Sequence, residues 1–207
     1  MIQAIDLIGD SIFDNQPYVD SGDSLIEQIS VISSVSVNLL AVDGDTTIHC
    51  LDVLKQQGGP KGDIGAVLSI GGNDALQSAP VLSESTNNVF EALTKLGMVA
   101  DTFRRNYLLV LEEMLGVYEK DLIRVCTIYN KIPIGPTLPK EALTALALFN
   151  DVITEEVNRR DLQLIDLRVI CDSNDCYSQV SPIEPSKEGG RRIVQAILHS
   201  FTETSCS

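Results

Sequence analysis

The sequence predicts a three-layer α/β/α sandwich, in which helices cover both faces of a parallel sheet of about five strands. Short runs rich in Ile, Val and Leu alternate with longer segments whose apolar residues have helical spacing. The short runs show little alternation of apolar and polar residues, which is typical of strands buried on both faces. No repeat or change of composition marks a boundary in the 207 residues, so we predict one domain over residues 1–207.

Each element follows from this pattern in turn. The predicted strands are 2–8, 35–42, 63–70, 122–129 and 162–167. The predicted helices are 24–33, 46–57, 86–118, 140–160 and 186–201, the third with a possible break at Gly97. Ser24 and Glu27 have the spacing of a capping box, which predicts where the first helix begins. The polar segment 75–88 is either a flap over a site or an ordinary surface loop.

The net charge of the chain limits the kinds of partner that it can bind. The chain has 29 acidic and 15 basic residues, which gives a net charge of −14. Such a surface repels phosphate backbones and anionic headgroups, so we expect neither nucleic acid nor membrane as a partner. The first basic residue is Lys55, so a site built from the preceding segment lies in a negative field, unless these acids only form a solvated face.

The cysteines and the amino terminus indicate the compartment. The chain starts with a predicted strand rather than a signal peptide, and no apolar stretch reaches the length of a membrane span. The chain has five Cys, two His and no Cys-x-x-Cys, so we expect no metal site and no cofactor. We predict a cytoplasmic protein with reduced thiols, in which Cys171 and Cys176 stay free although they are close enough in sequence to pair.

Three loops that follow predicted strands share one chemical character. They read Gly9-Asp10-Ser11, Asp43-Gly44-Asp45 and Gly71-Gly72-Asn73-Asp74. In a parallel sheet, the loops at the carboxyl ends of the strands form the binding site. Glycine lets a ligand approach the backbone closely, and exposed amides can bind an oxyanion.

These blocks resemble those of the SGNH hydrolases of the GDSL lipase/esterase superfamily, and the resemblance runs from the first strand to the last helix. It implies a flavodoxin-like strand order and a nucleophilic Ser11. It also implies that the Ser11 amide, the Gly44 amide and the Asn73 side chain bind the oxyanion. The second Gly-Asp-Ser, at Gly22-Asp23-Ser24, follows no strand, so we interpret Ser24 as a helix N-cap.

The last block departs from the family pattern Asp-x-x-His. The following Pro185-Ser186 aligns Ser181 with the Asp and Glu184 with the His. We interpret His49 and His199 as structural. We therefore predict that Glu184 is the general base and that Ser181 orients it by a hydrogen bond, the alternative being that Glu184 only caps the last helix.

The predicted function is hydrolysis of a small carboxylic ester by an esterase- or lipase-like serine hydrolase. Its site residues are Ser11, Gly44, Asn73 and Glu184. The acidic surroundings favour a neutral or cationic substrate over a fatty acid or acyl-CoA. The alternative is an inactive protein of the same fold that binds a small ester, acyl or sugar ligand, because neither the Asp nor the His of the family is present.

Overall fold

The computed structural model describes residues 2–133 and 140–202, and the sheet in this part of the chain has five parallel strands. The strands are β1 (Ala4–Gly9), β2 (Ser36–Leu39), β3 (Ile64–Ser69), β4 (Ile123–Cys126) and β5 (Gln163–Ile165). Their order in the sheet is β2-β1-β3-β4-β5, and every neighbouring pair is parallel. This is the flavodoxin-like order, so the predicted fold class is confirmed.

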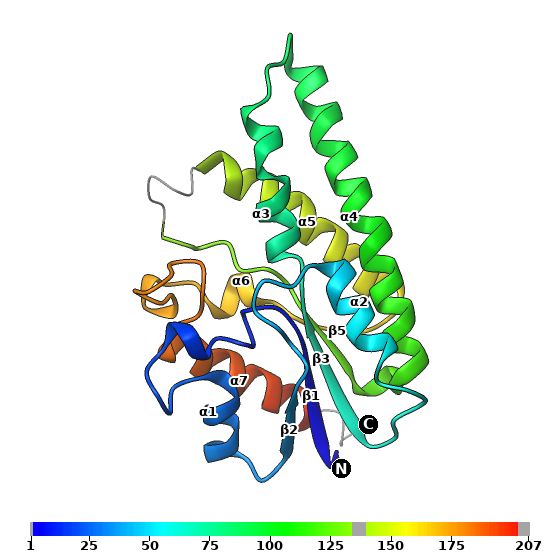
Figure 1. The fold of residues 1–207 in the computed structure, drawn as a ribbon, viewed down its shortest axis with the longest axis vertical. Coiled ribbons are helices and arrows are strands. Elements are labelled where there is room, and N and C mark those ends of the chain that lie inside the picture. The colour runs from blue at the N-terminus through cyan, green and yellow to red at the C-terminus, as the bar shows by residue number, and fades with distance from the viewer. Residues whose placement is uncertain (1, 134–139, 203–207) are drawn as a thin grey trace.

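Helices cover both faces of the sheet (Figure 1). One face carries α1 (Leu25–Ile32) and α7 (Lys187–Thr202), and the other carries α2 (Thr47–Lys55), α4 (Val89–Val117) and α5 (Lys140–Arg159). The shorter helices are α3 (Gly72–Ser78), α6 (Leu167–Ile170), η1 (Gln16–Tyr18), η2 (Ala79–Ser83), η3 (Lys120–Leu122) and η4 (Asn174–Cys176).

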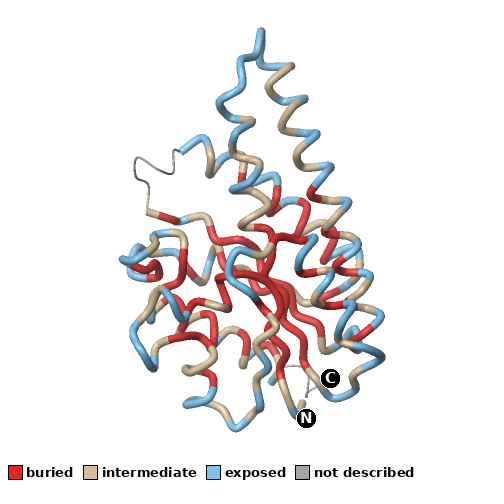
Figure 2. Tube along the Cα trace, in the orientation of Figure 1, coloured by how far each residue is buried: buried red, intermediate tan, exposed pale blue. Residues whose placement is uncertain are grey.

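The core lies on both sides of the central strands, which are the most deeply buried part of the chain (Figure 2). Successive residues of β3 divide between the two layers: Ala66 and Leu68 pack with α2, α4 and α5, whereas Val67 packs with α1 and α7. This two-sided burial explains why β1, β3 and β4 have nearly continuous apolar sequences.

Three details differ from the sequence predictions. The strands are shorter than predicted, and β2 is an edge strand with an alternating pattern of exposure, so it is not covered on both faces. Helix α4 continues unbroken through Gly97, which is exposed and has no neighbour within reach of a Cβ. Most of the predicted loop 75–88 is helical, because α3 and η2 occupy its first part.

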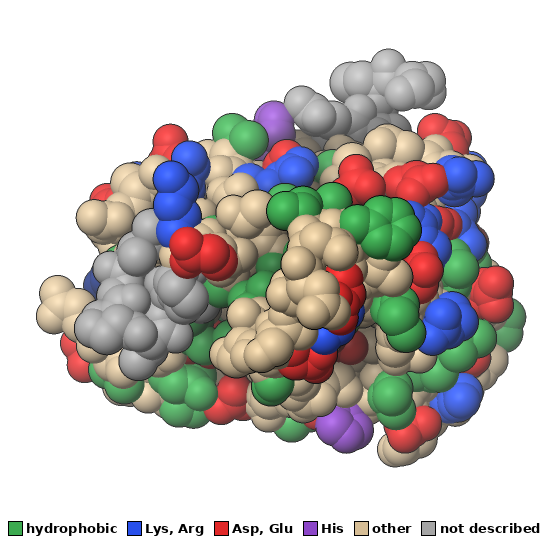
Figure 3. Space-filling view, turned by 90° about the horizontal axis from the view of Figure 1, so that it is seen from above, with side chains coloured by type: hydrophobic (Ala, Val, Ile, Leu, Met, Phe, Trp, Pro, Cys, Tyr) green, Lys and Arg blue, Asp and Glu red, His purple; other side chains and the backbone are tan. Residues whose placement is uncertain are grey.

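The segment 79–100, here called the arm, projects from the body of the molecule (Figure 1). It consists of η2, a short connection and the first half of α4. Val89, Phe90 and Leu93 on the arm are 62–80% exposed, and Figure 3 shows hydrophobic side chains among charged ones at this end. None of the helices in the described residues is long and apolar enough to cross a membrane.

Candidate active site

The three Gly-containing loops meet at the carboxyl edge of the sheet, as predicted. Gly9 ends β1 with a φ of +143°, and a Cβ at this position would lie 1.8 Å from the Ser69 carbonyl oxygen of β3. Only glycine allows this approach, which also lets the Asp10 N–H donate to the same oxygen at 3.2 Å. The chain then turns, and Ser11 follows directly at the edge of the sheet.

Of the two serines that follow Gly-Asp, Ser11 lines a pocket and Ser24 does not. Ser11 is 7% exposed, and its Oγ donates to Glu184 Oε1 at 3.0 Å, across 173 residues of sequence. Ser24, by contrast, is the N-cap of α1, where it forms the capping box with Glu27. The interpretation of Ser24 as a helix N-cap is therefore confirmed.

Asn73 and Asp74 attach the second loop to the third. Asn73 Nδ2 donates to the Asp45 carbonyl at 2.9 Å. Asp74 accepts from the Thr47 N–H at 3.0 Å and from the Thr47 hydroxyl at 2.6 Å, which fixes the start of α2. The amide nitrogen of Asn73 has two hydrogens, so one remains for a ligand.

Gly44 lies on the segment that Asn73 and Asp74 fix in place. It has a φ of +88°, a left-handed conformation that favours glycine, in a turn closed by the Asp45 N–H and the Val42 carbonyl. Gly44 is exposed, and within residues 2–133 and 140–202 its N–H has no hydrogen-bond acceptor. The structure thus brings Gly44 and Asn73 onto neighbouring loops and leaves donors available on both.

Glu184 is 5% exposed on the segment 178–186, here called the Glu184 loop. Burial raises the pKa of Glu184 from 4.5 to about 7, the hydrogen bond from Ser11 lowers it, and the charge of Asp43 raises it further. Its second oxygen, Oε2, is buried and has no hydrogen-bond partner among the described residues.

Two expectations about the neighbours of Glu184 need correction. The Ser181 hydroxyl does not orient the carboxylate; instead the Ser181 carbonyl accepts from the Glu184 N–H at 3.0 Å. Nor does Glu184 cap the last helix, because the Ser186 hydroxyl accepts from the Gly189 N–H at 3.1 Å and takes that role. Among the described residues, the Glu184 carboxylate bonds to the Ser11 hydroxyl alone, so Ser181 and Glu184 are joined only through the main chain.

Asp10 is a second buried carboxyl group beside Ser11. Burial raises its pKa from 3.8 to about 8, the hydrogen bond from the Ile12 N–H opposes this, and the charges of Glu184 and Asp74 add to it. Because the folded pKa exceeds the ordinary one, the folded chain binds more protons between about pH 4 and 8. The free energy of unfolding therefore falls as the pH rises through this window.

Asp10→Asn is expected to weaken this pH dependence, since Asn cannot ionise and keeps an oxygen for the Ile12 N–H. The Asp10 contribution amounts to a few kcal/mol between pH 5.5 and 8.5, or roughly 5–10 °C in Tm for a chain of this size. Thermal unfolding at the two pH values would show a smaller drop in the variant than in the wild type. Parallel drops would contradict the assignment.

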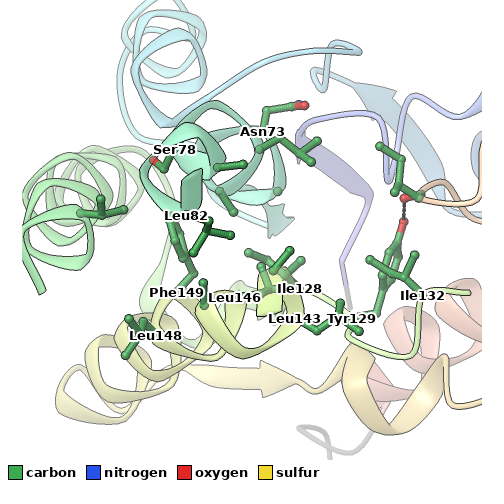
Figure 4. Close-up of a pocket in the computed structure, with 18 of the residues that line it drawn as sticks. Asn73, Ser78, Leu82, Ile128, Tyr129, Ile132, Leu143, Leu146, Leu148 and Phe149 are labelled. Atoms are coloured by element: carbon green, nitrogen blue, oxygen red, sulfur yellow. Dashed lines mark hydrogen bonds between the residues drawn. The ribbon is translucent and has the colours of Figure 1, made fainter. Parts of the chain in front are cut away.

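An apolar pocket opens beside Ser11, Asn73 and Glu184 and spans about 920 Å³ when its open, solvent-filled mouth is included. Figure 4 shows Leu82 from η2 facing Leu146 and Phe149 from α5, with Tyr129 and Ile132 at the other end. The base of the arm supplies Leu82, Leu96 and Val99 to its walls. Segment 75–88, for which the sequence left a flap and a surface loop open, therefore forms part of the pocket wall.

Neither histidine lines the pocket that contains Ser11. The His49 side chain is 60% exposed, with Nδ1 3.2 Å from the Thr46 hydroxyl at the start of α2. His199 is exposed in the last turns of α7. Cys50, Cys126, Cys171 and Cys176 are buried and free, and Cys206 lies outside the described residues. In the described part of the chain, no three His, Cys, Asp or Glu side chains are grouped so that they could hold a metal ion.

Sequence reasoning missed Tyr129 and Asn15. Tyr129 is the last residue of the predicted fourth strand, and its hydroxyl donates to the Ile183 carbonyl of the Glu184 loop (Figure 4). Asn15 is completely buried and bonds to both the Leu25 N–H and the Pro185 carbonyl. A polar residue soon after the Ser11 block was the available signal for Asn15; Tyr129 had none.

No protein-family model matches the chain, and no curated protein matches its sequence. Solved structures do match. A member of the lipolytic protein G-D-S-L family from Veillonella parvula DSM 2008 superposes with a TM-score of 0.70, at 13% identity, over 96% of this chain and 98% of the other. The lipase Lip_vut3 from a goat rumen metagenome gives 0.68 at 18% identity, over 97% of both chains.

A third match is the psychrotrophic esterase EstA from Pseudoalteromonas sp., solved in a form inhibited by monoethylphosphonate. It gives a TM-score of 0.64 at 13% identity, over 99% of this chain and 100% of the other. At such identities the likeness establishes the fold. The chain has the fold of the SGNH hydrolases, the GDSL lipase/esterase superfamily, as its sequence blocks predicted.

Proposed function

We propose that the chain hydrolyses carboxylic esters, with Ser11 as nucleophile and Glu184 as general base. The hydrogen bond of 3.0 Å from Ser11 Oγ to Glu184 Oε1 carries the proposal, since it is the contact through which the proton would leave the nucleophile. A carboxylate is an adequate base here because burial brings the pKa of Glu184 close to neutrality. The esterases and lipases among the structural neighbours agree with this reaction class.

The first half of the reaction forms an acyl-enzyme. Ser11 Oγ attacks the ester carbonyl carbon as its proton passes to the Glu184 carboxylate. The negative charge that develops on the carbonyl oxygen is bound by the Ser11 and Gly44 amides and by the free hydrogen on Asn73 Nδ2. The tetrahedral intermediate then collapses, the bond to the alcohol oxygen breaks, and protonated Glu184 returns its proton to the departing alcohol.

The second half releases the acid. Glu184 takes a proton from a water molecule, whose oxygen attacks the acyl carbon and forms a second tetrahedral intermediate in the same oxyanion site. Collapse of this intermediate breaks the bond to Ser11 Oγ, which takes the proton back from Glu184. One water molecule is consumed, and one acid and one alcohol are formed.

The residues that line the pocket around Ser11 indicate which substrates fit it. The pocket is lined mostly by Leu, Ile, Val, Ala and Phe side chains, so it suits an apolar acyl group better than a sugar. Asp43, whose charge reaches Glu184, lies on the Gly44 loop with Asp14 bonded to its N–H at 3.0 Å. These carboxylates support an ester whose alcohol is neutral or cationic.

The second candidate is a protein of this fold that binds an ester or acyl ligand without hydrolysing it. The observation that favours it is the side chain at 181, because Ser181 supplies no carboxylate to Glu184. The oxyanion donors would then bind a ligand carbonyl, and the apolar pocket would hold its acyl group.

A fluorophosphonate probe separates the two candidates, because it forms a covalent adduct only with an activated serine. One adduct in the intact mass of the wild type and none on Ser11→Ala is the expected result. Ser24→Ala is the matched control: it removes the other Gly-Asp-Ser hydroxyl and an N-cap worth about 1 kcal/mol, and it should label like the wild type. Folded wild-type protein without an adduct would favour the ligand-binding candidate.

A further inference from the structure

The main chain around Glu184 is fixed more firmly than its side chain. The Glu184 carbonyl accepts from the Ser178 N–H at 2.8 Å, and the Glu184 N–H donates to the Ser181 carbonyl at 3.0 Å. Both bonds lie within the Glu184 loop and close it on itself. Among the described residues, by contrast, the carboxylate has Ser11 as its one hydrogen-bond partner at Oε1, and Oε2 has none.

Two side chains from outside the loop hold the residues on either side of Glu184. The Tyr129 hydroxyl donates to the carbonyl of Ile183, the residue before it. Asn15 Nδ2 donates to the carbonyl of Pro185, the residue after it, at 3.4 Å. The two contacts therefore flank Glu184 along the chain and tie both of its neighbours to other parts of the fold.

Both side chains are themselves buried and have a further contact. Tyr129 follows β4, is 2% exposed, and packs edge-on against the Tyr177 ring with centroids 5.1 Å apart. Asn15 is 0% exposed and also accepts from the Leu25 N–H at 2.9 Å, which ties it to the start of α1. Through these two side chains, the main chain on either side of Glu184 is anchored to the end of β4 and to the segment that follows Ser11.

The chemistry of a carboxylate explains why main-chain contacts on either side of Glu184 are enough to orient it as a base. A histidine base needs a second side chain to select its tautomer and hold its ring. A carboxylate has two equivalent oxygens and needs only to be placed. We propose that Tyr129, together with Asn15, is a positioning residue that holds Glu184 against Ser11 through the main chain, in place of an orienting side chain. This inference rests on the proposed role of Glu184 as base.

Tyr129→Phe removes the contact, and Tyr177→Phe is its matched control. The Tyr177 hydroxyl also donates to a backbone carbonyl, that of Cys171 at 2.9 Å, and Tyr177 is 4% exposed. Both variants lose one buried hydroxyl, but only Tyr129→Phe frees Ile183. We expect Tyr129→Phe to lower kcat for a neutral ester about ten-fold with little change in KM, and Tyr177→Phe to change it less than about two-fold.

The pH profile supplies a readout that a loss of stability does not move. Glu184 faces Asp10 beside Ser11, Asp43 on the Gly44 loop, and the hydroxyls of Tyr18 and Tyr129. A loosened Glu184 loop admits water, and hydration lowers the pKa of the carboxyl group from about 7 towards its ordinary value. The midpoint of the kcat profile should therefore move to lower pH in Tyr129→Phe and stay in place in Tyr177→Phe.

The possible results distinguish the positioning role of Tyr129 from the proposed function itself. Tyr129→Phe with wild-type kcat and pH midpoint, or equal losses in both variants, overturns the inference while the proposed function stands. A folded wild type that hydrolyses no ester and takes no fluorophosphonate overturns both. If Tyr129→Phe does not fold, Asn15→Asp replaces it, since it keeps the acceptor for Leu25 and loses the donor to Pro185; unchanged kcat there also overturns the inference.

Discussion

Glu184→Gln is expected to lower kcat/KM for ester hydrolysis about 10²–10³-fold. Gln has the same shape and keeps an oxygen for the Ser11 hydroxyl, but it cannot accept the proton. Since the pKa of Glu184 is raised to about 7 and only the ionised form is a base, wild-type activity should rise between pH 6 and 8 and then level off. The variant should lose this rise. Initial rates against pH with a neutral short-chain ester test both statements.

Glu188→Gln is the matched control for this variant. Glu188 lies four residues further on, and its carboxylate bonds to Arg191 at 2.6 Å and to Arg192 at 2.9 Å, outside the pocket. Its replacement should change kcat/KM less than about two-fold, because these surface ion pairs contribute little to stability and lie away from Ser11. If Glu184→Gln retained most of the wild-type rate while Ser11→Ala lost it, another group would have to be the base.

Asn73→Ala is expected to lower kcat about 10²–10³-fold, because the oxyanion loses a preorganised donor. KM should change little, since this donor acts mainly on the charge that develops in the transition state. The variant also loses the bond to the Asp45 carbonyl, so thermal unfolding should be measured beside the kinetics.

Asn38→Ala controls for that structural loss. Asn38 Nδ2 donates to Asp6 Oδ1 at 2.7 Å, on β2 and away from the pocket. Both variants remove one side-chain hydrogen bond, worth about 1 kcal/mol, but Asn38→Ala should keep the wild-type kcat. A similar kcat in the two variants would rule out Asn73 as an oxyanion donor.

Much of the fold could be predicted because burial leaves a simple pattern. The apolar runs that become β1, β3 and β4 are covered on both faces, and the Ser24–Glu27 pair marks the start of α1 by local hydrogen bonds alone. Prediction failed where neighbours decide the conformation. Segment 75–88 has polar residues and Pro80, yet its first part belongs to α3 and η2, whose Leu76, Ala79 and Leu82 line the pocket.

The candidate site, too, could be predicted only in part from the sequence. The sequence placed Ser11, Gly44 and Asn73 at the ends of successive strands, and parallel strands end at one edge. It also aligned Glu184 with the family's histidine. It could not show what holds Glu184, because Tyr129 and Asn15 lie 54 and 170 residues from the carbonyls that they contact.

The sequence by itself determined the order of the elements, the parallel sheet and the residue types at its carboxyl edge, because periodicity and glycine-rich turns act over a few residues. Only the tertiary structure decided that the Ser181 side chain does not reach Glu184, that Ser186 caps α7, and that an apolar pocket opens beside Ser11. Those features depend on which side chains meet across the sheet, and desolvation there sets the pKa values of Asp10 and Glu184.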